Sequence, residues 1–216
     1  MQRAVLPPRF TALLACVLLA AACGGEAPGP AEPSVASEDL VRAGPHETAV
    51  LTLEELGTIR IELLPELAPE SVAHFKKLVE ERLYDGTTFH RVIPGFMIQG
   101  GDPLTKNIDP RDDGRGGADY DIIDEYSDMP HARGVVSLAN KGRHLTAGSQ
   151  FFIVQQDTPQ LDGMFTVFAR VVEGIEVVDA VTELEIDKYG RYGPQDRPYP
   201  KDARISSIRI EPAEPS

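Results

Sequence analysis

The chain has 216 residues, the length of one domain with accessory segments, and 42% of them are hydrophobic, enough for a sizeable core. Its formal net charge of −13 argues against a nucleic-acid-binding protein, because phosphates require a basic surface. Both cysteines, Cys16 and Cys23, lie near the N-terminus. The rest of the chain therefore has no thiol for a disulfide or a cysteine metal site.

The N-terminus has the features of an export signal. Arg3 and Arg9 precede a short apolar run that ends in three alanines directly before Cys23. This pattern predicts a secretory signal peptide over residues 1–22 rather than a membrane span, which needs about 20 apolar residues. The alanines and Cys23 resemble a bacterial lipoprotein cleavage site. We therefore expect a lipid on Cys23 and a location in the bacterial cell envelope, facing the periplasm from the outer membrane where the cell has one; ordinary cleavage that leaves a free cysteine is the alternative.

Residues 23–44 are rich in proline, alanine, glutamate and glycine and offer little to bury. Such a composition predicts a disordered tether. A flexible segment of about 20 residues reaches roughly 25 Å, enough to lift a domain off a membrane. Residues 45–216 are then expected to form the folded domain.

The domain begins with two predicted strands and a helix. Residues 49–53 and 58–64 predict the strands, and in the second strand apolar and charged residues alternate, as expected for one buried and one solvated face. Pro69 favours the first position of a helix, and Gly86 ends this region. The apolar stripe of the helix consists of Val72, Phe75, Leu78 and Val79.

Residues 89–102 predict a hairpin in which runs 89–93 and 96–99 flank a Pro-Gly turn. Alternation along such strands places Phe89, Arg91 and Ile93 on one face. Arg91 is the one cation in this apolar stretch, and Gln99 supplies an amide near its end. An apolar floor with one cation and one amide on its rim suits a neutral peptide better than a charged metabolite.

The sequence of the second half predicts four more strands and one helix between long loops. Residues 104–121 form a polar loop with several aspartates, but the spacing of an EF-hand is absent, so we expect no metal. Strands are predicted at residues 135–139, 151–155, 166–172 and 204–210, a helix at 175–184 and a loop at 189–201. Many short strands with two helices indicate a mainly β protein, a barrel or a sandwich, because closure removes exposed sheet edges.

Three blocks resemble the motifs of the cyclophilins, which are peptidyl-prolyl cis-trans isomerases. They are residues 89–102, residues 148–153, and Leu161-Asp162-Gly163 followed by residues 166–171. The resemblance covers about residues 49–211. It implies a closed eight-stranded antiparallel barrel capped by two helices, with a packed interior and a site on the outer surface. It also implies a prolyl isomerase that needs no cofactor and no metal.

An X–Pro bond rotates slowly because amide resonance imposes a barrier of about 18–20 kcal/mol. Catalysis requires a pocket for the proline ring and a donor to the prolyl nitrogen, which stabilises the twisted state. Arg91 suits the donor role because its guanidinium is always charged. The motifs imply that Gln99 and Gln150 bind the peptide backbone and help to orient Arg91. Ala139 and Asn140, at the end of a predicted strand, resemble the edge with which the family pairs the peptide backbone. The residues implied for the proline pocket are Phe96, Met97, Phe152, Leu161 and Phe165.

Gln160 and Phe165 differ from the tryptophan and histidine of many eukaryotic cyclophilins, which bears on inhibitor binding rather than on activity. His90 is interpreted as a structural residue, and Phe151 as part of the core. The expected partners are proline-containing polypeptides of exported proteins and, through the lipid anchor, a membrane; the protein is expected to be a monomer. Two alternatives are a tethered chaperone or scaffold with incidental catalysis and an anchored small-ligand barrel, for which nothing indicates a hollow interior.

Overall fold

The computed structural model describes residues 46–140, 142, 147–191, 193–198 and 203–213. The predicted signal peptide, Cys23 and the tether lie outside these residues. One antiparallel sheet contains eight strands, in the spatial order β10-β1-β2-β7-β5-β6-β4-β3. Their bounds are β1 (Thr48–Leu53), β2 (Gly57–Leu63), β3 (Arg91–Ile93), β4 (Met97–Gly100), β5 (Val135–Leu138), β6 (Phe151–Val154), β7 (Val167–Glu173) and β10 (Ile205–Glu211).

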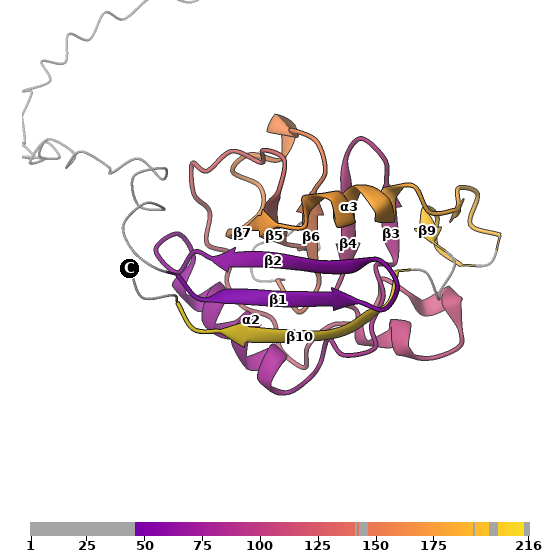
Figure 1. Cartoon of the computed structure of the whole chain (residues 1–216), viewed down its shortest axis with the longest axis horizontal. Coiled ribbons are helices and arrows are strands. Elements are labelled where there is room, and N and C mark those ends of the chain that lie inside the picture. Colours follow the sequence, from indigo (N-terminus) through magenta and orange to yellow (C-terminus); the bar gives the residue numbers. More distant parts are fainter. Residues whose placement is uncertain (1–45, 141, 143–146, 192, 199–202, 214–216) are drawn as a thin grey trace, which may run out of the picture. The chain divides into compact units, whose positions relative to one another are not determined.

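Two α-helices accompany this sheet in the described part of the chain, α2 (Pro69–Glu80) and α3 (Ile175–Thr182). Figure 1 shows them on different sides of the sheet; α2 contacts β10 and β7, and α3 contacts β2, β3 and β4. A short strand pair consists of β8 (Ile186–Asp187) and β9 (Arg197–Pro198). The prediction of a loop over 189–201 is therefore wrong at β9, which lies inside this range. The described residues also contain three short 3-10 helices: Pro103–Lys106, Pro110–Asp112 and Pro159–Leu161.

The sheet curls so that its two end strands, β3 and β10, come close. Thr88 and Arg204, which precede these strands, form an isolated antiparallel bridge. The amide of Phe89 donates to the carbonyl of Ala203 at 3.0 Å, and the amide of Ile205 donates to the carbonyl of Thr87 at 2.8 Å. The prediction of eight antiparallel strands with two helices is confirmed. The two end strands of the sheet, β3 and β10, meet through these few hydrogen bonds rather than through a full ladder.

The main core lies inside the curl. In β2, Ile59, Ile61 and Leu63 are buried, as the alternating pattern predicted. The α2 residue Phe75 packs its ring 5.1 Å from the ring of Phe168, measured between centroids. Helix α2 has no side-chain cap of its own at Ala68. Instead, the carboxylate of Glu125 accepts hydrogen bonds from the amide and hydroxyl of Ser71, which suits the positive end of a helix.

Helix α3 begins directly after Gly174, whose backbone has φ +83. A Cβ at this position would lie 2.2 Å from the carbonyl oxygen of Thr58, so the turn accepts only glycine. This close approach fixes α3 against β2. The helix ends at Thr182, two residues earlier than the pattern predicted.

A second, smaller apolar cluster lies outside the main core. In β4 and β6, Ile98 and Phe151 face the main core, whereas Met97 and Phe152 belong to the outer cluster. This alternation places the candidate site on the outer face of the sheet, as expected. The prediction that Phe89 shares a face of the sheet with Arg91 is wrong. Phe89 is fully buried in the main core, whereas Arg91 is exposed. Regular alternation starts only where β3 begins, at Arg91.

Candidate active site

A small pocket of about 140 Å³ lies over the outer cluster. The residues that line it are Arg91, Phe96, Met97, Gln99, Ala139, Asn140, Phe152, Leu161 and Phe165. Gln150 lines the adjoining cavity together with Gln99, Ala139 and Asn140. The structure therefore brings together the residues that the sequence predicted for the site, except Cys23, which lies outside the described residues.

The floor and walls of this pocket are apolar. Met97 and Phe152 are almost completely buried. The rings of Phe152 and Phe165 pack edge to face, with centroids 5.3 Å apart and planes at 88°. This arrangement is favourable for aromatic pairs. It leaves a concave, rigid surface of a kind that accepts a compact apolar ring.

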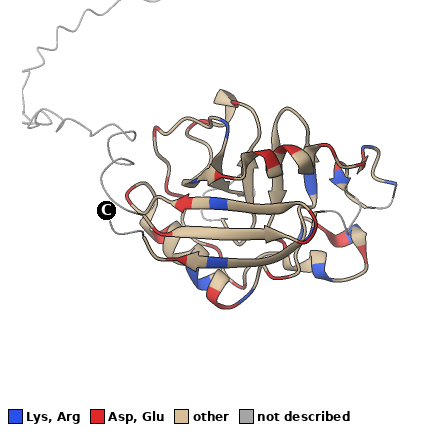
Figure 2. Ribbon diagram, in the orientation of Figure 1, with Lys and Arg blue, Asp and Glu red and all other residues tan. Residues whose placement is uncertain are grey.

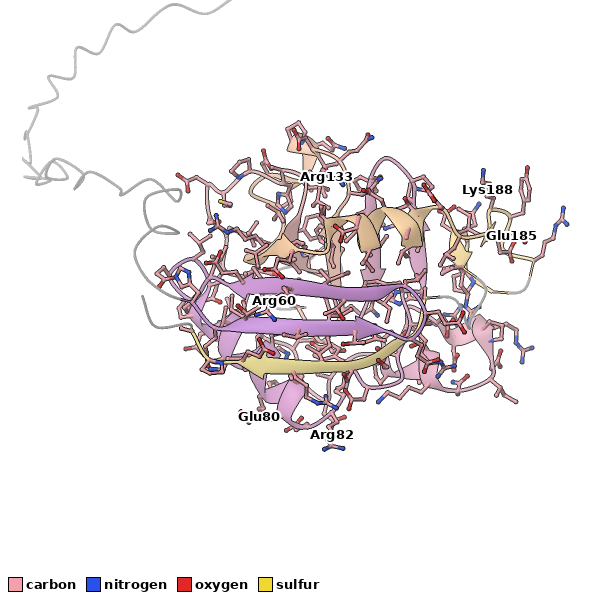
Figure 3. The ribbon with its side chains drawn as sticks, in the orientation of Figure 1. Arg60, Glu80, Arg82, Arg133, Glu185 and Lys188 are labelled. Carbon is pink, nitrogen blue, oxygen red and sulfur yellow. The ribbon has the colours of Figure 1, made fainter. Side chains whose placement is uncertain are left out.

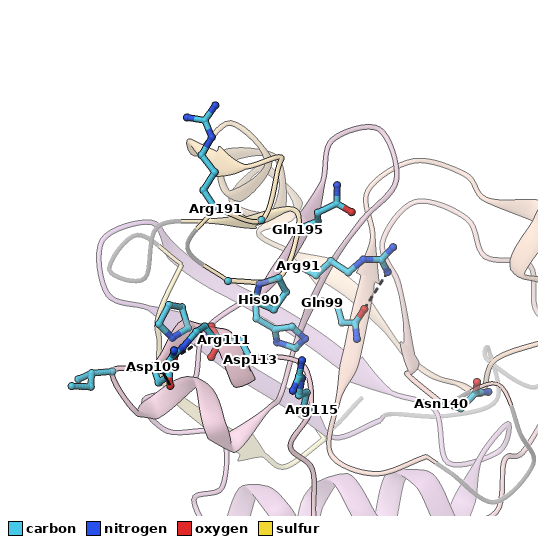
Figure 4. A pocket seen from close by; sticks show the side chains of 16 residues that line it. His90, Arg91, Gln99, Asp109, Arg111, Asp113, Arg115, Asn140, Arg191 and Gln195 are labelled. Atoms are coloured by element: carbon cyan, nitrogen blue, oxygen red, sulfur yellow. Dashed lines mark hydrogen bonds and ion pairs between the residues drawn. The ribbon is translucent and has the colours of Figure 1, made fainter.

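Arg91 stands at the rim of the pocket and is held there by a chain of hydrogen bonds. Its Nη1 donates to Oε1 of Gln99 over 3.4 Å, as the dashed line in Figure 4 shows. The amide nitrogen of Gln99 donates to Oε1 of Gln150 at 2.9 Å. Gln150 in turn donates to the carbonyls of Gly114 and Gly116 at 3.0 and 2.8 Å. Because Arg91 and Gln99 also face each other in the β3–β4 ladder, the guanidinium is directed by two neighbouring strands.

The loop that holds Gln150 is anchored by Asp102, a residue for which no role was predicted from the sequence. Asp102 is fully buried, and its carboxylate accepts from the amides of Leu104, Gly114 and Gly116. A Cβ at Gly116 would lie 2.1 Å from Oδ1 of Asp102. The glycine therefore allows the close approach that ties the loop to the end of β4.

A second chain of hydrogen bonds, not predicted from the sequence, runs from exposed Asp162 through buried His131 to buried Ser137 and supports the pocket. Nδ1 of His131 lies 3.0 Å from Oδ1 of Asp162, and its Nε2 lies 3.1 Å from the hydroxyl of Ser137. Since a carboxylate can only accept, Nδ1 carries the proton and Nε2 accepts from Ser137. Burial lowers the pKa of His131 despite the nearby carboxylate of Asp162. The neutral ring stacks on Phe152, with planes at 17°, and so fixes the pocket floor.

His90 is almost fully buried beside Arg91, and neither of its ring nitrogens has a hydrogen-bond partner among the described groups. Burial lowers its pKa to about 4, against the opposing effect of the carboxylate of Asp102. The ring is therefore neutral near pH 7. This burial agrees with a structural role.

Ala139 and Asn140 follow β5 and are half-buried at the pocket rim. The amide of Ala139 donates to the carbonyl of Gln150 at 2.9 Å. The side-chain nitrogen of Asn140 donates to the carbonyl of Met164 at 3.1 Å. Both residues thus lie in fixed positions at the edge of the pocket.

The described residues offer neither a metal cluster nor a membrane-spanning helix. No group of three or more histidine, cysteine, aspartate or glutamate side chains in that part of the chain could hold a metal ion. None of the helices found there is long and apolar enough to cross a membrane.

Comparison with known proteins identifies the family. A family profile described as cyclophilin-type peptidyl-prolyl cis-trans isomerase matches residues 48–210. Peptidyl-prolyl cis-trans isomerase B of Bacillus subtilis is 43% identical over 144 residues, which cover 66% of this chain and 95% of the relative. A peptidyl-prolyl cis-trans isomerase of Synechococcus elongatus is 45% identical over 133 residues, which cover 61% and 86%.

Among solved structures, a cyclophilin-type isomerase of Cryptosporidium parvum, crystallised in the presence of the dipeptide Ala-Pro, superposes with a TM-score of 0.65. It is 29% identical, and the match covers 76% of this chain and 98% of that one. Sequence, fold and site thus lead to the same result: the chain belongs to the cyclophilin-type peptidyl-prolyl cis-trans isomerases.

Proposed function

We propose that Arg91 performs the isomerisation by donating a hydrogen bond to the prolyl nitrogen while the proline ring occupies the apolar pocket. Donation favours the pyramidal nitrogen of the twisted state and weakens amide resonance, so the transition state is stabilised more than the ground state. The observation that supports this role is the guanidinium, held by Gln99 at the rim of a pocket of about 140 Å³. The reaction requires no cofactor.

The other site residues have binding roles in this proposal. Phe96, Met97 and Phe152, with Leu161 and Phe165, enclose the proline ring. Gln99 and Gln150 bind the peptide backbone and orient Arg91, and Ala139 and Asn140 pair with the backbone of the residues next to the proline. The hydrogen bonds that already fix these side chains support such a preorganised surface.

Accelerated refolding of a protein limited by proline isomerisation tests the proposal. Added wild-type domain is expected to speed the slow phase, whereas the Arg91→Ala variant leaves it near the uncatalysed rate. A chaperone or scaffold with incidental catalysis is the second candidate, favoured by the apolar pocket. It predicts that wild type and Arg91→Ala raise the refolding yield equally, even where wild type speeds the slow phase slightly.

We also propose that the substrates are exported proteins and that the domain acts as a monomer held at the cell envelope by a lipid on Cys23. The support is the N-terminal sequence, in which a basic start, an apolar run and small residues precede Cys23. The composition of residues 24–44 supports a tether that lets the domain reach substrates near the membrane.

Replacing Cys23 with serine is expected to release the protein from the membrane fraction or to block its processing. Serine offers no thiol for the lipid, and stable attachment takes more than one acyl chain. Fractionation of cells that express wild type or Cys23→Ser measures the change, and Cys16→Ser serves as the matched control that should stay in the membrane. Mass spectrometry that finds an unmodified Cys23 at the mature wild-type N-terminus would contradict the anchor.

A further inference from the structure

A second, larger cleft adjoins the proline pocket and has a volume of about 1160 Å³. It shares Arg91, Gln99 and Asn140 with that pocket. One wall is the loop over residues 108–115, and the other is the segment around Gly190 and Gln195. In Figure 4, Arg91 lies between Arg191 on one side and Arg115 on the other. A peptide bound at the pocket therefore has an open path into this cleft.

The cleft carries more positive than negative charge. Four arginines line it, and they are Arg91, Arg111, Arg115 and Arg191. The two carboxylates that line it are each paired with an arginine. Asp109 pairs with Arg111 at 2.7 Å, and buried Asp113 pairs with Arg197 from β9.

Three of the cleft's arginines lack a carboxylate within ion-pair distance in the described part of the chain. Arg91 has only the amide of Gln99, and Arg191 lies over the ring of Tyr189 at 5.5 Å. For Arg115, whose side chain is exposed, no carboxylate of the described residues pairs with the guanidinium. These cations are therefore available to a ligand.

This excess of cations is unusual for the molecule, whose net charge is −13. Acidic residues lie on many surface elements, and α3 carries acidic but no basic side chains (Figure 2). A cleft with an excess of one charge sign next to a binding site attracts ligands of the opposite sign. The acidic remainder of the surface repels the same ligands and so guides them to the cleft.

We infer that this cleft binds acidic residues of the substrate polypeptide close to the isomerised X–Pro bond. The inference rests on the proposed isomerase function, because it places the proline of the same chain in the small pocket. Arg91 lies in both cavities, and an extended chain spans about 3.3 Å per residue. The favoured glutamate or aspartate is thus among the residues nearest to the proline. Guanidinium groups suit this role because their donors match the geometry of a carboxylate.

The test uses otherwise identical X–Pro peptides that carry glutamate, glutamine or lysine at each position up to three residues from the proline. Binding is measured by fluorescence anisotropy, and turnover as kcat/KM, at a low ionic strength of about 20 mM, where charges are weakly screened. At one or more positions, we expect the glutamate peptide to exceed the glutamine peptide by about three- to tenfold in both quantities. Lysine should be weakest, and high salt should remove the differences.

The variant Arg115→Gln/Arg191→Gln removes two cleft cations outside the proposed catalytic machinery. It should turn over the glutamine peptide like wild type but lose the preference for glutamate. The matched control, Arg82→Gln/Lys77→Gln, removes the same amount of positive charge near the end of α2. Figure 3 shows Arg82 far from Lys188, and Lys188 is close in sequence to the cleft residue Arg191. This control should keep the preference.

Two results would overturn the inference: equal binding of glutamate and glutamine peptides by wild type at every position, or an unchanged preference in the cleft variant. Equal loss of preference in the control pair would also overturn it, because the effect would then come from overall charge. Failure of wild type to turn over even the glutamine peptide would instead contradict the isomerase proposal. The anisotropy measurement still decides the charge preference in that case.

Discussion

Replacing Arg91 with alanine is expected to lower kcat/KM for an X–Pro peptide by at least about tenfold, a loss of ~1.4 kcal/mol of transition-state stabilisation. The variant loses the donor to the prolyl nitrogen but keeps the apolar pocket, so KM should change less than kcat. Folding should be preserved, because the Arg91 side chain is exposed and its one described hydrogen bond, to Gln99, is long. A protease-coupled peptide assay and a thermal melt measure the two effects.

Two control variants test whether the effect comes from the hydrogen-bond donors of Arg91 or from its positive charge. Arg91→Lys keeps the positive charge but loses the planar set of donors, and it should recover only part of the activity. Arg82→Ala removes an exposed arginine away from the site and should leave kcat/KM unchanged. Full activity in a folded Arg91→Ala protein would show that the reaction does not depend on this donor.

Acidification from pH 7 to pH 4 is expected to destabilise the domain, with a contribution on the order of 3 kcal/mol from His90 alone. The pKa of His90 is about 4 in the folded protein and about 6.5 in an unfolded chain. Between these values the unfolded state binds more protons, so the free energy of unfolding falls as the pH falls through this window. Burial also lowers the pKa of His131, which adds a loss of the same sign.

Urea unfolding at a series of pH values between 7 and 4 measures this slope. The variant His90→Gln should show a shallower loss, because glutamine does not titrate. His46→Gln is the matched control with the opposite sign: although burial lowers its pKa, the hydrogen bonds of His46 to Glu62 and Glu66 raise it overall. Because this contribution is complete below the unfolded pKa of about 6.5, removing His46 should steepen the loss only at the upper end of the series, near pH 7 to 6, and leave the slope at lower pH unchanged. An identical slope in wild type and His90→Gln would exclude His90 as a source of the acid sensitivity.

The regular parts of the fold were predictable because they depend on short-range patterns. The alternation of Ile59, Ile61 and Leu63 predicted the buried face of β2, and Pro69 marked the start of α2. Phe89 was assigned to the wrong face because the sequence does not show that strand pairing begins only at Arg91. A pattern with period two is informative only inside the strand that imposes it.

Most of the pocket residues could be named in advance because they lie in or directly beside short contiguous motifs; Ala139 and Asn140 were indicated instead by their place at the end of a strand. The supporting residues could not, because their partners are distant in sequence: His131 is held by Asp162, and the loop amides reach back to Asp102. For the same reason, the cationic cleft could not be predicted from the sequence. Arg91, Arg115 and Arg191 are separated along the chain, and only the fold gathers them around one cavity.

The central claim is that this domain catalyses rotation about the X–Pro bond through Arg91 rather than merely binding proline. Exchange NMR on an X–Pro peptide with a substoichiometric amount of protein tests it directly, because it measures binding and cis–trans interconversion in one sample. We expect wild type to accelerate the interconversion. Arg91→Ala should still shift the peptide resonances through binding, with interconversion at least about tenfold slower than with wild type. Equal exchange rates with the two proteins, or binding by wild type without acceleration, would contradict the account.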